Sequence, residues 1–177
     1  SRAAPATRPQ RLANFVRDPL PPQAGEELDH PMTHTIRPLT HADRPQWDQL
    51  WQGYLTFYES AVPADFTDLT WQRILDPEAP IHAFCAAQPD GKLLGIVHYL
   101  FHPVTWAAGP RCYLEDLFTN PDARGKGVGR ALIEAVYAAA DQRGADQVYW
   151  LTQEFNATAR KLYDQVAKAT PFIKYRR

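Results

Sequence analysis

The chain has 177 residues, of which 45% are hydrophobic and 22% charged, and its formal net charge is −1. This length suits one domain with a single substantial core, and the charge balance excludes a global field that would draw the protein onto nucleic acid or an anionic membrane. No apolar run approaches the roughly 20 residues of a membrane span, and no apolar secretory segment opens the chain. We therefore expect a cytoplasmic protein without nucleic-acid or membrane partners.

The first part of the chain differs in composition from the rest. Residues 1–31 hold six of the sixteen prolines, together with scattered Arg, Ala and Gln, and little in this segment could pack into a core. We predict a Pro-rich N-terminal extension, extended or partly ordered, over residues 1–31 and one folded domain over residues 32–177.

From residue 33 onward the hydrophobic periodicity indicates regular elements. Thr40 and Asp43 resemble a capping pair in front of an amphipathic helix that reaches about Ser60. The "PDGK" between two apolar runs is a hairpin turn signal, because Asp-Gly tolerates positive φ. In chain order we expect a strand at 34–39, helices at 45–60 and 67–76, and strands at 81–88, 92–102 and 110–119.

A glycine-rich turn then leads into a helix whose apolar stripe ends at Gly144. A strand at 147–152, a helix that opens at Asn156 and a strand at 172–175 complete the chain. The order is β-α-α-β-β-β-α-β-α-β, with antiparallel hairpins first and a βαβ unit after them. It predicts an α/β protein of the α+β type, with a mixed central sheet of about six to seven strands and helices on both faces.

The two cysteines, Cys85 and Cys112, each lie in an apolar, strand-like run. Reduced core thiols are therefore expected rather than a disulfide or a catalytic thiol. Because the sequence has no Cys-x-x-Cys and no spaced His cluster, we expect no metal site.

The stretch "RGKGVG" (124–129) brings three glycines and two cations to the start of a helix. A P-loop requires Gly-x-x-x-x-Gly-Lys-Ser/Thr, but Asn120 stands at the first glycine position and Gly127 follows Lys126. The dinucleotide fingerprint fails as well, because its glycines need different spacing. What remains is Arg-x-x-Gly-x-Gly at a helix N-terminus, whose free N–H groups suit a diphosphate; the alternative is a solvated turn with incidental charges.

The stretch "RGKGVGRALI" after "YLEDLFTNPDA" resembles the acetyl-CoA-binding motif of the GNAT superfamily of N-acetyltransferases. The downstream "NATARKLYDQVA" resembles the second motif of that superfamily, Asn-x-x-Ala-x-x-Leu/Phe-Tyr, and the likeness covers about residues 34–177. "YLEDLF", "VYWLTQEFN" and "FIKYRR" look like the histone/polyamine acetyltransferase branch, and the diamine and spermidine/spermine acetyltransferases share the Leu-Glu-Asp step. The resemblance implies the GNAT fold, with acetyl-CoA in the gap of a splayed pair of parallel strands.

The resemblance also implies which residues hold acetyl-CoA. The backbone at the end of the 110–119 strand would pair with the pantetheine amides and polarise the thioester carbonyl, and the diphosphate would sit on the glycine turn. Asn156 would cap its helix and contact the pantetheine arm, although the cap role alone could explain this residue. The expected cofactor contacts are Leu117, Phe118, Thr119, Arg124, Gly125, Lys126, Gly127, Val128, Gly129, Arg130, Asn156 and Tyr163.

Three residues are expected to carry the chemistry. Tyr163 matches the tyrosine that usually protonates the leaving thiolate in the superfamily, although it also continues an apolar helix stripe. Glu115 is the expected base, acting through water, and Asp116 shares in holding a substrate cation. The alternative is that one carboxylate pairs with an arginine or with backbone N–H groups. Neighbouring strand residues point to opposite faces, so at most one of the two faces a given site unless a bulge intervenes.

Tyr58 and Glu59 lie in the first helical region, where relatives place residues that bind the acceptor. His98, His102 and Trp106 could line the same pocket. For the two histidines, packing or surface roles are expected rather than catalysis. The leading hypothesis is transfer of acetyl from acetyl-CoA to a primary amine, namely a polyamine, a diamine or an amino acid. The alternatives are acetylation of lysines in basic protein tails and a non-catalytic acetyl-CoA sensor. Relatives are often dimers, so we expect a homodimer that uses the C-terminal "FIKYRR".

Overall fold

The structure is a computed structural model that describes residues 33–177. The predicted extension at residues 1–31 lies outside the described residues, so the expected domain boundary stays a prediction. Among the described residues, no helix has both the length and the apolar character needed to cross a membrane.

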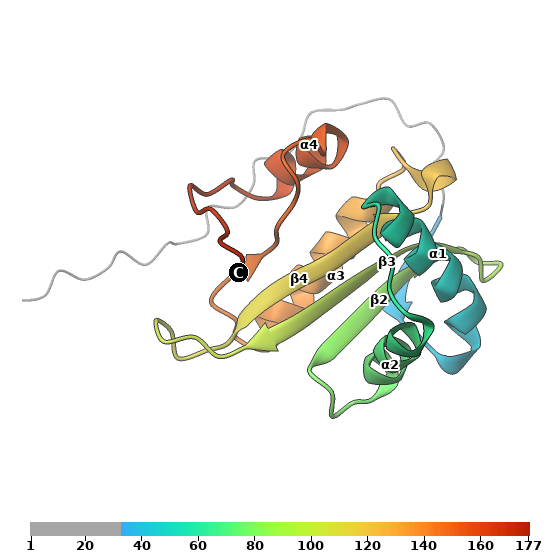
Figure 1. The fold of residues 1–177 in the computed structure, drawn as a ribbon, viewed down its shortest axis with the longest axis horizontal. Coiled ribbons are helices and arrows are strands. Elements are labelled where there is room, and N and C mark those ends of the chain that lie inside the picture. Colours follow the sequence, from blue (N-terminus) through green and yellow to red (C-terminus); the bar gives the residue numbers. More distant parts are fainter. Residues whose placement is uncertain (1–32) are drawn as a thin grey trace, which may run out of the picture. The chain divides into compact units, whose positions relative to one another are not determined.

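Five strands form one sheet in the order β1-β2-β3-β4-β5 (Figure 1). The pairs β1–β2, β2–β3 and β3–β4 are antiparallel. The pair β4–β5 is parallel, as the predicted βαβ unit requires. The strands are Thr35–Pro38 (β1), Ile81–Ala87 (β2), Leu93–His102 (β3), Arg111–Thr119 (β4) and Val148–Tyr149 (β5).

The prediction of six to seven strands was wrong for the described part of the chain, which has five. Residues 172–175 form no strand, and the side chains of Phe172 and Ile173 are 83% and 74% exposed. The expected strand at 147–152 shortens to the two residues of β5. A two-residue edge strand offers a neighbour almost no backbone groups to pair with, so the last segment has no ladder to join.

Helices cover both faces of the sheet, which confirms the predicted layering (Figure 1). Two helices pack on one face around the buried Trp47 and Ile96, and two pack on the other face around Leu132 and Val136. The first pair is Arg44–Phe57 (α1) and Ala64–Leu75 (α2), the second is Val128–Gln142 (α3) and Ala157–Val166 (α4), and short 3-10 helices span His41–Asp43 (η1) and Pro121–Ala123 (η2).

The predicted capping pair forms at the entry to α1. The Asp43 carboxylate accepts hydrogen bonds from the backbone N–H and the hydroxyl of Thr40 at 2.7 and 2.8 Å. The Arg37 guanidinium donates two more, at 2.7 and 2.8 Å. These donors, Arg37 first among them, lower the pKa of Asp43 from 3.8 to about 2, so this buried carboxylate is fully paired.

Both thiols are buried and free, which confirms the prediction for Cys85 and Cys112. Burial raises the pKa of each to about 11, so neither is a ready nucleophile near neutral pH. Within residues 33–177, no three His, Cys, Asp or Glu side chains gather in a way that could hold a metal ion.

Candidate functional site

The glycine turn lies between η2 and α3, at the end of β4. Gly127 is the N-cap of α3 and has φ 79° and ψ −3°, and Gly125 has φ 74°. Positive φ favours glycine at both positions. A Cβ built at either glycine would meet no atom within 4 Å, so the space in front of the first N–H groups of α3 is open to a ligand.

The cationic side chains around this turn are held by neighbouring backbone and helices. Arg124 Nε donates to the carbonyl oxygen of Thr119 at 3.4 Å, and Lys126 Nζ donates to that of Asp122 at 3.0 Å. Arg130 donates to the side-chain oxygen of Gln165 on α4. Together with the positive end of α3, these groups give the turn a positive character that suits an anion.

Two other residues of the turn have packing roles. Val128 is 1% exposed and belongs to the core under α3. A Cβ on Gly129 would lie 3.2 Å from a Leu162 side-chain carbon, so this glycine lets α4 approach α3 closely. The turn and α4 are therefore packed together, and the second sequence motif lies beside the first.

The parallel strands β4 and β5 pair over two residues only. Cys112 faces Val148 and Tyr113 faces Tyr149. Beyond Tyr113 the backbone of β4 pairs on one side with β3, and no described strand pairs with its other edge as far as Thr119. The expected splayed pair is thus present, with the backbone of residues 117–119 along its open edge.

Phe118 and Leu117 fix this open edge from the two faces of the sheet. Phe118 is buried among the residues under α1, and a Cβ on Gly53 would lie 2.7 Å from its ring. Leu117 packs on the opposite face, against the core under α3. Residues 117 and 118 thereby hold the strand end between two packed layers.

A β-bulge changes the direction of the side chains in the middle of β4. The register runs from His98 opposite Asp116 directly to Tyr99 opposite Leu114, so Glu115 is the extra residue. Leu114 packs under α3, whereas Phe118, four residues on, packs under α1. Strict alternation would put both on one face, so the bulge brings Glu115 and Asp116 onto the α1 face together.

The two carboxylates differ in their surroundings. Glu115 keeps contact with solvent, yet partial desolvation and then repulsion by Asp116 raise its pKa. Asp116 accepts a hydrogen bond from His98 Nδ1 at 3.0 Å, and its side chain is 15% exposed. Burial, and then the negative charge of the nearby Asp116, raise the pKa of Tyr54.

Tyr163 approaches the same region from α4. Its ring packs edge-on against Trp150 with ring centroids 5.3 Å apart. Burial, and to a smaller extent Tyr58, raises its pKa to about 12, so the phenol is protonated at physiological pH. Tyr58 lies at the end of α1, with its ring 5.0 Å from that of Tyr54. Tyr163 therefore lies near Tyr58, while Tyr54 of α1 lies near Asp116.

The remaining predicted residues lie at the edge of this arrangement or outside it. Asn156 is the N-cap of α4 and accepts from the Ala159 N–H at 3.4 Å, so its cap role is present. Glu59 is exposed, with φ 50°, in the turn after α1. Trp106 is 84% exposed in the loop before β4. His102 bonds with Pro103 and Tyr149 and so anchors that loop.

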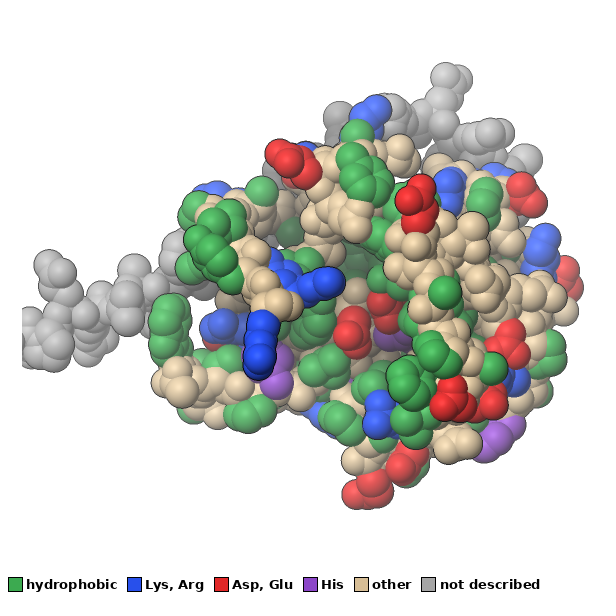
Figure 2. All heavy atoms as spheres, in the orientation of Figure 1, with side chains coloured by type: hydrophobic (Ala, Val, Ile, Leu, Met, Phe, Trp, Pro, Cys, Tyr) green, Lys and Arg blue, Asp and Glu red, His purple; other side chains and the backbone are tan. Residues whose placement is uncertain are grey.

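A space-filling view of the α1 face shows acidic side chains in a hollow above the middle of the sheet, with Lys and Arg side chains beside it (Figure 2).

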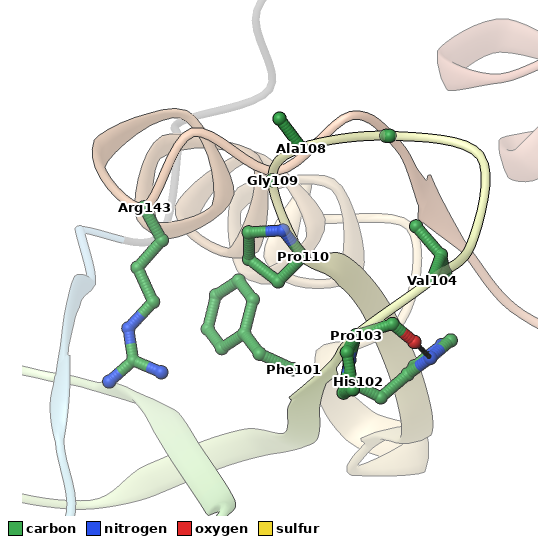
Figure 3. Close-up of a pocket in the computed structure, with 9 residues that line it drawn as sticks. Phe101, His102, Pro103, Val104, Ala108, Gly109, Pro110 and Arg143 are labelled. Atoms are coloured by element: carbon green, nitrogen blue, oxygen red, sulfur yellow. Dashed lines mark hydrogen bonds between the residues drawn. The ribbon is translucent and has the colours of Figure 1, made fainter.

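A separate hollow of about 290 Å³ lies at the other end of β4, where Phe101 and Pro110 line it between Arg143 and His102 (Figure 3). It contains no carboxylate, and the nine residues of β4, from Arg111 to Thr119, separate it from the glycine turn by about 26 Å of strand.

Sequence reasoning missed Tyr54, Trp47 and the contact role of His98. Tyr54 and Tyr58 are one helical turn apart and could have been read as a pair on one face of α1. The contact between Trp47 and His98 joins residues 51 positions apart, and no local pattern indicates it.

Three features of this site are typical of a coenzyme A-dependent acyltransferase. They are the short pairing of the parallel strands β4 and β5, the glycine turn at the N-terminus of α3, and the adjacent face with two carboxylates and several tyrosines. The family model described as the acetyltransferase (GNAT) family matches residues 47–167. The chain belongs to this family and is an acetyltransferase that uses acetyl-CoA as its acetyl donor.

The relatives of this chain include several N-acetyltransferases. The D-amino-acid N-acetyltransferase HPA3 of Saccharomyces cerevisiae is 35% identical over 143 residues, which is 80% of this chain and 89% of that protein. The thialysine N-epsilon-acetyltransferase of Bos taurus is 34% identical over 77 residues, 43% of this chain and 45% of that protein.

Among solved structures, AAC(6')-Iy in complex with a CoA-linked bisubstrate analogue has a TM-score of 0.71 at 21% identity, and the match covers 82% of this chain and 97% of that one. The ribosomal-protein-alanine N-acetyltransferase of Brucella melitensis biovar Abortus 2308 has a TM-score of 0.68 at 24% identity, over 81% and 97% of the two chains. Both likenesses concern the fold.

Proposed function

We propose that this protein transfers the acetyl group of acetyl-CoA to the primary amine of a small cationic acceptor: an amino acid, a polyamine or a diamine. The bulge in β4 carries the proposal, because it turns Glu115 and Asp116 to the same face. Two carboxylates beside Tyr54 and Tyr58 offer a positively charged amine both ion pairing and aromatic contact.

The residues for the donor follow from the open edge of β4 and the glycine turn. Backbone groups of residues 117–119 would pair with the pantetheine arm, and the N–H groups at residues 124–130 would hold the diphosphate. The open space around Gly125 and Gly127 fits that group. Acetyl-CoA supplies the activated thioester, and the chain positions it.

The proton steps are assigned to Glu115 and Tyr163. The acceptor enters as an ammonium, since a free alkylamine has a pKa near 10.4. Glu115 takes one proton through water, its raised pKa making it a better base than an ordinary glutamate. As the nitrogen bonds to the carbonyl carbon and the carbon–sulfur bond breaks, the Tyr163 hydroxyl gives its proton to the sulfur. The second proton that the nitrogen loses restores the Tyr163 hydroxyl through solvent, and the proton on Glu115 passes to solvent. The products are the N-acetylated acceptor, CoA and one released proton.

The named relatives favour an amino-acid acceptor. One acts on D-amino acids and another on thialysine, and both acceptors carry a primary amine. Acetylation of lysines in basic protein tails is the second candidate, because the acidic hollow faces solvent (Figure 2). A third, an acetyl-CoA sensor without turnover, is disfavoured by the presence of both Glu115 and Tyr163.

A CoA-release assay tests the proposal over a panel of D- and L-amino acids, thialysine, diamines, spermidine and a lysine-rich peptide. We expect turnover on at least one small amine and the highest kcat/KM within that class. Turnover on the peptide alone would favour the protein-directed alternative. Binding of acetyl-CoA without turnover on any acceptor would refute catalysis.

We further propose a cytoplasmic homodimer. The C-terminal segment supports the dimer, since Phe172, Ile173 and Tyr175 are 83%, 74% and 88% exposed, and a row of exposed apolar side chains is typical of an interface. Light scattering at micromolar concentration should give twice the monomer mass, and truncation after residue 169 should return the monomer. A monomeric full chain contradicts the dimer.

A further inference from the structure

His98 lies at the centre of a buried polar chain that joins α1 to the two carboxylates. It is 2% exposed on β3. Trp47 Nε1, on α1, lies 3.0 Å from His98 Nε2, and His98 Nδ1 lies 3.0 Å from an Asp116 carboxylate oxygen. Tyr54 of α1 meets the same carboxylate.

The identity of the partners fixes the protonation state of the imidazole. An indole N–H can only donate, so His98 Nε2 must accept from Trp47. An imidazole nitrogen that accepts a hydrogen bond carries no proton. The single proton of His98 is therefore on Nδ1, where it is donated to Asp116.

We propose that His98 is a positioning residue which, held by Trp47 as the neutral Nδ1–H tautomer, orients Asp116 toward the acceptor without cancelling its charge. This inference rests on the proposed function, because it assigns Asp116 to recognition of a cationic amine. The groups that face His98 and its partner carboxylate are Glu115 and Tyr113 of β4, Tyr54 of α1, and the ring of Trp51.

A protonated imidazole at this position would have a different effect. It would put a positive charge 3.0 Å from Asp116 and oppose the binding of an ammonium group. Because Nε2 accepts from Trp47, the imidazole donates to Asp116 without bringing a positive charge to the acceptor site.

Two substitutions of His98 separate its two hydrogen bonds. The amide nitrogen of His98→Asn can occupy the place of Nδ1 and still donate to Asp116, whereas the amide oxygen of His98→Gln can accept from Trp47 but leaves Asp116 without its donor. We expect His98→Gln to raise the KM for the amine about ten- to a hundredfold, and His98→Asn by less than about fivefold. The KM for acetyl-CoA should stay the same in both.

The tautomer itself is tested by histidine 15N NMR on the full chain, which needs no turnover. At neutral pH, wild-type His98 should carry its single proton on Nδ1, with Nε2 as a hydrogen-bonded acceptor, and Trp47→Phe should lose the chemical shift of a hydrogen-bonded Nε2. Trp51→Phe is the matched control: it removes a buried indole N–H of the same aromatic stack that has no hydrogen-bond partner, and His98 should behave in it as in the wild type.

Kinetics give the second readout. The amine KM of Trp47→Phe should be about tenfold higher than that of Trp51→Phe, because only Trp47 holds His98. A proton on Nε2 of wild-type His98, equal amine KM values in the two His98 variants, or equal amine KM values in the two tryptophan variants would overturn the inference. An inactive wild type with the expected NMR result would instead refute the proposed function.

Discussion

Gly127→Ala tests whether the glycine turn holds the donor, and Gly91→Ala is its matched control. Gly127 has φ 79° and Gly91, in the hairpin turn between β2 and β3, has φ 86°. At both positions a Cβ would meet no atom within 4 Å. The two substitutions therefore cause the same backbone strain and no clash within the chain.

The strain of an alanine in the left-handed region is about 1–2 kcal/mol. For a domain of this size, that destabilisation lowers the Tm by roughly 2–8 °C, and the two variants should be alike in this respect. They should differ in the affinity for acetyl-CoA. A methyl group in front of the first N–H groups of α3 should remove one or two charge-assisted hydrogen bonds to the diphosphate, which is about ten- to a hundredfold in affinity.

The assay is the Kd for CoA by calorimetry, together with the KM for acetyl-CoA and the Tm of each variant. We expect Gly127→Ala to bind CoA about ten- to a hundredfold more weakly than Gly91→Ala, at a Tm within about 2 °C of it. Equal CoA affinity in the two variants would refute the assignment of the diphosphate to this turn. A much lower Tm for Gly127→Ala alone would refute the equal-strain reasoning.

Three further predictions concern single groups. Tyr163→Phe should lower kcat roughly ten- to a thousandfold, with a much smaller change in the CoA Kd, and an unchanged kcat removes this hydroxyl from the mechanism. Because the pKa of Glu115 is raised, kcat/KM should rise with pH along a limb that lies above the usual glutamate value of about 4.3; persistence of that limb in Glu115→Gln would assign it to another group. Arg37 lowers the pKa of Asp43 to about 2, so the pair stabilises the fold above about pH 4 and this contribution is lost between about pH 4 and 2. Asp43→Asn should reduce the free energy of unfolding at pH 7 by roughly 2 kcal/mol, and equal acid sensitivity of the variant and the wild type in urea melts contradicts it.

The sequence was informative where a feature depends on neighbouring residues. The capping pair of Thr40 and Asp43 and the turn into α3 are local, since each depends on residues within a few positions. Hydrophobic periodicity was sufficient to predict helices on both faces, because one apolar stripe per helix specifies which side packs on the sheet.

The sequence alone did not predict the features that depend on how a strand pairs with its neighbour. Glu115 and Asp116 look like adjacent residues of a regular strand, and only the pairing of β4 with β3 reveals the extra residue. The same holds for the last segment. Residues 172–175 have an apolar pattern typical of a strand, but a strand also needs a partner with free backbone groups, and the two residues of β5 do not provide one.

The bulge links the two halves of the site. Because residue 115 is inserted, the part of β4 beyond it reverses its faces, so Phe118 points under α1 and Leu117 under α3. This reversal brings both carboxylates to the acceptor side, and Asp116 then lies within reach of His98. The edge of residues 117–119, which directly follows Asp116, has no partner strand because β5 ends at Tyr149, and it is the edge proposed for the donor. One irregularity in one strand therefore places the two carboxylates next to the unpaired edge of residues 117–119, which is why the proposed function puts the chemistry at the middle of β4 and the diphosphate at its end.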